Sequence, residues 1–141
     1  MRRATIISAA ALLLSVAPTL ADNGVDSARE TAIRTVITQQ LDAFRQEDGV
    51  AAEAFAAPGI RDKFPDPNGF MEMVRKSYSA LVRPKSTRFE ALTQTGLGLV
   101  QKMTVVDSAG VVWTVAYAMT QIDGQWRISG CFVLKSDAVD T

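Results

Sequence analysis

The chain has 141 residues, which is room for one domain, and its 48% hydrophobic and 21% charged residues are typical of a globular protein. Its 15 basic and 15 acidic residues balance, so the composition indicates no basic surface for nucleic acid. The sequence contains no histidine and a single cysteine, Cys131. A His-containing catalytic triad, imidazole-based metal sites and an internal disulfide are therefore excluded, and we expect neither a metal nor a cofactor.

The first 21 residues have the pattern of a secretory signal peptide. Arg2 and Arg3 give a positive start, an apolar run covers 6–16, and Thr19 and Ala21 place small side chains at the −3 and −1 positions of a cut after Ala21. The apolar run is too short to span a bilayer. We expect an exported protein, periplasmic or secreted, that is not held in a membrane after cleavage. The alternative is a buried N-terminal helix.

Three helices are predicted in the N-terminal half of the mature chain. A flexible lead over 22–26 precedes a capping box, in which Ser27 and Glu30 bond each other's backbone amides, and a helix to about Gln46. Gly49 is suited to the left-handed position that ends a helix. The apolar face of this helix comprises Ala32, Ile33, Val36, Ile37, Leu41 and Phe44.

The second and third helices are shorter. Residues 50–57 predict an alanine-rich helix and 60–65 a connector. The third helix starts at Asp66 and Pro67, because Asp caps a helix and Pro fits its first turn. Pro84 cannot continue that helix. Its apolar face comprises Phe70, Met73, Val74, Ser77, Tyr78 and Leu81.

From Thr87 onward the hydrophobicity alternates with a period of two, which predicts strands over 87–95, 97–106, 110–122 and 125–134. The pair Asp123-Gly124 is a strong hairpin signal, because both central residues of a type I′ turn need positive φ. Three helices followed by four antiparallel strands predict an α+β fold. We expect one domain over 27–135 and a tail at 136–141.

The two faces of the last hairpin differ in composition. One face carries large apolar residues, which should meet the helices: Trp113, Val115, Tyr117, Met119, Trp126, Ile128, Phe132 and Leu134. The other carries small or semi-polar residues: Thr114, Ala116, Ala118, Thr120, Arg127, Ser129 and Cys131. We expect this second face either to be solvated or to form a homodimer by sheet-on-sheet contact. Cys131 itself is interpreted as a small buried hydrophobe.

Several stretches are similar to known families. The ending Asp123-Gly124-Gln125-Trp126-Arg127-Ile128, after three helices, resembles the nuclear transport factor 2-like (cystatin-like) superfamily. More narrowly, the chain resembles the bacterial family called domain of unknown function 4864. That resemblance is carried by 40–45, 55–60, 70–75, Tyr78, Arg83-Pro84 and 126–131. It extends over about 28–135 and implies helices packed on a curved, cone-shaped sheet, with an interior that is either an open pocket or filled.

Members of the superfamily include isomerases, dehydratases, ligand-binding proteins and dimeric interaction modules, so the fold does not choose among these functions. Catalytic members generally hold a His, Asp or Glu in the pocket, and the inward faces of the last two strands carry none here. We predict a non-catalytic module that binds a small ligand or a protein. The alternatives are a ketosteroid-isomerase- or dehydratase-like enzyme acting on a small apolar substrate, and a structural homodimer or partner subunit.

Three polar residues are candidates for lining a pocket. Tyr78 and Tyr117 lie on apolar faces, where a pair of phenols could orient a carbonyl group, and Arg83 could bind a carboxylate bidentately. The ligand is then small, and apolar or carboxylated. The competing interpretation makes both tyrosines core aromatics and Arg83 a donor to carbonyls at the end of the third helix. The candidate interface comprises Thr114, Ala116, Arg127, Ser129 and Cys131.

Overall fold

The computed structural model describes residues 20–136, with side chains from Asp26 onward. The predicted signal peptide and tail lie outside these residues, apart from Leu20, Ala21 and Ser136. The helices of the described part are α1 (Leu20–Arg45), α2 (Gly49–Ala54), α3 (Pro58–Arg61), α4 (Pro67–Ser77) and the 3-10 helix η1 (Ser79–Leu81). The strands are β1 (Ser86–Thr95), β2 (Gly98–Val106), β3 (Val112–Ile122) and β4 (Gln125–Lys135). None of the described helices is both long and apolar enough to cross a membrane.

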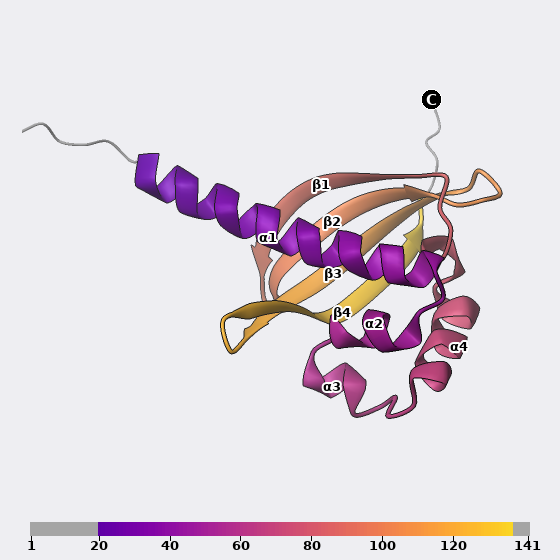
Figure 1. Ribbon diagram of the computed structural model, residues 1–141. Helices are drawn as coiled ribbons and strands as arrows, with labels where there is room; N and C mark the ends of the chain where they lie inside the picture. Colours follow the sequence, from indigo (N-terminus) through magenta and orange to yellow (C-terminus); the bar gives the residue numbers. More distant parts are fainter. Residues whose placement is uncertain (1–19, 137–141) are drawn as a thin grey trace, which may run out of the picture.

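The fold is α+β, as predicted. The four strands form one antiparallel sheet in the order β1-β2-β3-β4. Figure 1 shows α1 running across one face of the curved sheet, with α2, α3 and α4 gathered near β4. The core lies between these helices and the sheet, and its fully buried side chains include Ile33, Ile37, Leu81, Met103 and Val115. Each such side chain contributes about 1.5–3 kcal/mol to stability by leaving water.

The first helix starts earlier than the sequence predicts. It runs without a break from Leu20, so residues 22–26 are helical and Ser27 lies inside the helix. A cap is not needed there, because upstream turns provide backbone partners for the amides at Ser27. Glu30, the predicted capping partner, forms an i,i+4 ion pair with Arg34 instead.

The turn after α1 assigns the left-handed conformation to Glu47 (φ 52°) rather than to Gly49. Gly49 is buried and is the first residue of α2. Asp48 caps this helix, since its carboxylate accepts the Ala51 N–H at 3.1 Å. A glycine is required at 49 because a Cβ would collide with the carbonyl of Pro67, where α4 begins.

The predicted helix over 50–57 is divided. It ends at Ala54, Phe55 forms its C-cap in the helical region, and Ala56 forms an isolated parallel bridge with Ile128 at the edge of β4. The Ile128 N–H donates to Phe55 O and the Ala57 N–H donates to Ile128 O, both at 2.8 Å. α3 then occupies the start of the segment predicted as a connector, so four α-helices replace the predicted three among the described residues. α4 starts as predicted, with the Asp66 carboxylate accepting the Asn68 N–H.

The predicted strands and the final hairpin are confirmed. Each strand bound differs from its predicted position by at most two residues. The Asp123-Gly124 turn has the two positive φ values, 52° and 77°, that a type I′ turn needs. Because its loop has two residues, this hairpin fixes the register of β4 against β3 near the turn.

A β-bulge then exchanges the two faces on which the side chains of the second half of β4 lie. Ile128 pairs with Met119, but Gly130 pairs with Ala118, so Ser129 is one residue too many for the ladder. An extra residue on one strand shifts all later side chains to the opposite face.

The predicted faces of β4 are therefore wrong beyond Ser129. Cys131 and Val133 pair with Tyr117 and Val115 and lie on the side of the sheet that faces the helices. Phe132 and Leu134, predicted to be in the core, project from the outer face and are 51% and 68% exposed. Cys131, predicted to be in the interface, is on the inner side.

Candidate functional site

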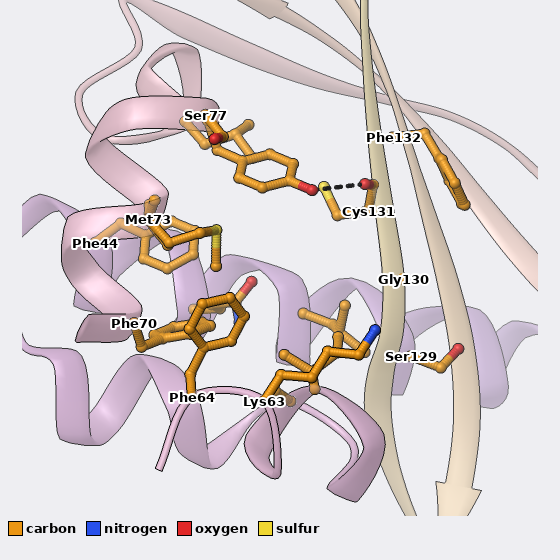
Figure 2. A pocket seen from close by; sticks show the side chains of 17 residues that line it. Phe44, Lys63, Phe64, Phe70, Met73, Ser77, Ser129, Gly130, Cys131 and Phe132 are labelled. Carbon is orange, nitrogen blue, oxygen red and sulfur yellow. Dashed lines mark hydrogen bonds between the residues drawn. The ribbon is translucent and has the colours of Figure 1, made fainter. Parts of the chain in front are cut away.

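An apolar pocket of about 430 Å³ lies between β4 and the helical segment from α3 to η1. Figure 2 shows Phe64, Phe70 and Met73 on one side of it and the β4 residues Ser129 to Cys131 on the other. Phe70 packs against Phe44 and Phe64, with ring centroids 6.4 and 6.0 Å apart. These tilted and edge-to-face rings give the pocket a stiff aromatic wall, because aromatic side chains held by their neighbours have little freedom to collapse.

The pocket exists because two separate contacts tie the helices to β4. The first is the bridge between Ala56 and Ile128, two residues that line the pocket and so close it on that side. The second is a hydrogen bond in which Tyr78, the residue after α4, donates its hydroxyl to Cys131 O at 3.2 Å, drawn as the dashed line in Figure 2. Between these two contacts the bulge at Ser129 interrupts the regular edge of β4, and the side chains leave a space.

Few polar side chains reach this space, and two of them, Gln40 and Tyr78, already donate hydrogen bonds to backbone carbonyls. The buried Gln40 amide donates to Ala52 O at 3.1 Å. Burial, and next the neighbouring Cys131, raise the pKa of the Tyr78 phenol above its ordinary value. Burial raises the pKa of the Cys131 thiol to about 12. Among the described residues that line the pocket there is no Asp or Glu, so at neutral pH none of its acids is ionised.

We expect the Cys131 thiol to be inert in the native protein. A pKa of about 12, against an ordinary value of 9.0, lowers the thiolate fraction at neutral pH roughly a thousandfold. Native protein should therefore react far more slowly with a disulfide reagent than protein unfolded in urea. The stability that is linked to this pKa shift is fully present below about pH 9. It is lost as the pH rises from about 9 towards 12, because the thiol ionises first in the unfolded chain. Equal labelling rates in the native and unfolded states would contradict this expectation.

The structure separates the three residues predicted to line a pocket. Tyr78 lines it. Tyr117, on β3, is 1% exposed and belongs to the core between the sheet and the helices, not to the pocket lining. Arg83 lies outside, where it donates to Arg45 O at 3.3 Å and lies 3.8 Å from Glu47. Arg83 thus bonds the end of α1, which is the structural role weighed above, although at the first helix rather than the third.

The predicted interface residues are also divided. Thr114 and Ala116 lie on the outer face of the sheet, opposite Leu134 and Phe132. Arg127 bonds its own strand, donating to Trp126 O at 2.8 Å and to Gln125. Ser129 and Cys131 line the pocket instead. The outer face, defined here by Thr114, Ala116, Phe132 and Leu134, is therefore more apolar than the sequence predicts.

Sequence reasoning missed Lys63. This residue follows α3, and it is the one charged residue among the described residues that line the pocket. A signal was present, because Lys63 is followed by an aromatic residue, Phe64, within the predicted connector. The connector gave no reason to place it opposite β4.

A search of curated proteins finds no match to the chain. The family described as domain of unknown function (DUF4864) matches residues 26–141, most of the chain and all of the pocket. The chain belongs to this family.

Proposed function

We propose that the protein binds a small apolar molecule in the pocket beside β4 and does not transform it. The pocket itself is the observation that carries this proposal. Its volume of about 430 Å³ lies within the roughly 300–1,000 Å³ of ligand sites, and such sites combine apolar walls with a few polar groups. The curved sheet with helices on one face, and a pocket at one side, also supports the nuclear transport factor 2-like cone as the fold.

The enzyme alternative has less support. Isomerisation or dehydration of a small apolar substrate requires a group that takes or gives a proton near neutral pH. No carboxylate is present in the described lining, and the raised pKa values of Tyr78 and Cys131 keep both groups protonated. A binding function needs none of these groups to ionise.

Fluorescence of the neutral probe N-phenyl-1-naphthylamine tests the binding proposal. We expect the wild-type protein to enhance its emission saturably. Met73→Trp places a large ring in the pocket and should weaken probe binding at least about ten-fold. Glu72→Trp is the matched control, because Glu72 is the exposed neighbour on the same helix and does not line the pocket.

Two outcomes would overturn the proposal. One is no saturable enhancement by wild-type protein, and the other is equal loss of binding in both variants. Thermal unfolding of each variant shows whether it is folded when the comparison is made.

We also propose that the protein is exported, on the basis of the signal-like residues 1–21. Cleavage after Ala21 would leave the described core of α1 whole, because the buried positions among its described side chains, from Asp26 onward, begin at Ile33. N-terminal sequencing of protein recovered from the periplasm or medium should give Asp22 as the first residue. Uncleaved protein confined to the cytoplasm would contradict export.

The outer face of the sheet supports a second candidate function, a homodimer. Phe132 and Leu134 are both largely exposed there, next to the small residues Ala116 and Thr114. Sedimentation velocity at micromolar concentration should show a dimer that Leu134→Lys dissociates. Leu97→Lys is the control, since Leu97 is 65% exposed in the turn between β1 and β2. A monomeric wild-type protein would rule this candidate out.

A further inference from the structure

Lys63 distinguishes this pocket from a purely apolar one. Its backbone is fixed in the turn after α3, where its N–H donates to Ile60 O at 3.0 Å. Figure 2 shows the side chain extending along the lower side of the pocket from this turn towards β4. The apolar stem of the side chain thereby forms part of the wall, and the ammonium group remains at the rim.

The charge on Lys63 has no partner within the described residues. The ion pairs there all use arginines, and no carboxylate lies within 4.0 Å of the Lys63 ammonium group. The two acids nearest in sequence are placed elsewhere. Asp62 lines a separate surface hollow, and Asp66 accepts the Asn68 N–H at the start of α4.

The remaining polar groups of the pocket cannot replace this charge. The Tyr78 hydroxyl and the Gln40 amide donate to backbone carbonyls, as described above. Ser77 and Ser129 are the other side chains with polar atoms in the described lining, apart from the protonated thiol of Cys131. A ligand that fills the apolar space therefore meets one strong electrostatic group, and that group is a cation.

From these contacts we infer that the pocket selects a monoanion with an apolar tail, such as a medium-chain carboxylate, whose head group pairs with Lys63. This inference rests on the proposed function. The tail lies against Phe64, Phe70 and Met73, and the carboxylate stays at the rim, where it accepts hydrogen bonds from the ammonium group. A neutral amphiphile of the same length fills the same space without the ionic contact.

Displacement of N-phenyl-1-naphthylamine by decanoate and by decanol tests the inference, because the two ligands share a tail and differ in charge. Lys63→Met retains an apolar stem and removes the charge. It should weaken decanoate binding about five-fold, which is the contribution expected from a partly exposed, charge-assisted hydrogen bond. The same substitution should change decanol binding less than about two-fold. Lys63→Arg should retain the preference for decanoate. Added salt should weaken decanoate binding to the wild-type protein and leave decanol unaffected.

Lys76→Met is the matched control, because Lys76 is exposed on α4 and does not line the pocket. Equal effects of Lys63→Met on both ligands, or equal loss in Lys76→Met, would overturn the assignment of Lys63 and leave apolar binding intact. Absence of binding by the probe, decanol and decanoate alike would overturn both the inference and the proposed function.

Discussion

Replacing Gly49 with alanine should lower the free energy of unfolding by about 2–3 kcal/mol, the upper part of the range for overpacking a core. The added Cβ would collide with the carbonyl oxygen of Pro67 and lie 2.9 Å from Met71 Cγ. The methionine can move, but the carbonyl belongs to the first turn of α4 and cannot. Relief requires α2 and α4 to separate, and α4 carries one wall of the pocket. Urea unfolding followed by circular dichroism measures the change.

Gly59→Ala provides the control for this experiment. Gly59 lies within α3, and a Cβ there meets nothing within 4 Å. The substitution should be neutral or stabilise the protein by up to about 1 kcal/mol, because alanine loses less backbone entropy than glycine in a helix. A similar loss of stability in both variants would show that the contact with Pro67 is not the cause.

The second large effect is expected at Gln101, which is 0% exposed although its side chain is polar. Its amide nitrogen donates to Glu90 O and Lys102 O, both at 2.8 Å, and its oxygen accepts from Arg34 Nε at 3.3 Å. Glu90 lies in the irregular part of β1, where the pairing with β2 shifts by one residue between Phe89 and Leu92. Gln101 thus satisfies backbone groups that the interrupted ladder leaves free.

Gln101→Leu should therefore cost about 2–3 kcal/mol of unfolding free energy, since buried groups that lose a partner cost about 1–3 kcal/mol each.

Tyr117, the cross-strand partner of Gln101, gives the opposite expectation. The Tyr117 hydroxyl is buried and has no hydrogen-bond partner among the described residues. Tyr117→Phe should change stability by less than about 0.5 kcal/mol or increase it by about 1 kcal/mol. Equal losses in the two variants would mean that volume, not hydrogen bonding, governs this part of the core.

The strands could be predicted from alternating hydrophobicity, and the final turn and the start of α4 from the residues that form them. Asp123-Gly124 specifies its turn by its own φ requirement, and Asp66-Pro67 specifies a helix start by one side-chain oxygen and one missing N–H. These features depend on residues adjacent in sequence. The α+β order follows from them, and so does the inner position of Tyr117 and Val115.

What the sequence could not supply depends on contacts between distant segments. The bulge at Ser129 adds one residue to an otherwise alternating strand, and alternation alone cannot show on which side of such an insertion the register changes. The pairing of 55–57 with Ile128 joins segments more than 70 residues apart, and it divides a stretch whose composition is helical. Since both features border the pocket, its lining, including Lys63, could not be predicted from periodicity.

The pairing of 55–57 with β4 also protects the sheet from other chains. An exposed edge strand is a template for intermolecular strand addition and aggregation. Here Ile128 has both backbone groups occupied by Phe55 and Ala57, and the carbonyl of Cys131 accepts from Tyr78. At the opposite edge, β1 carries a register shift and the ion pair between Arg88 and Glu90. The segment that closes the pocket therefore also makes β4 a poor partner for a second strand, so variants that loosen it should aggregate before they unfold completely.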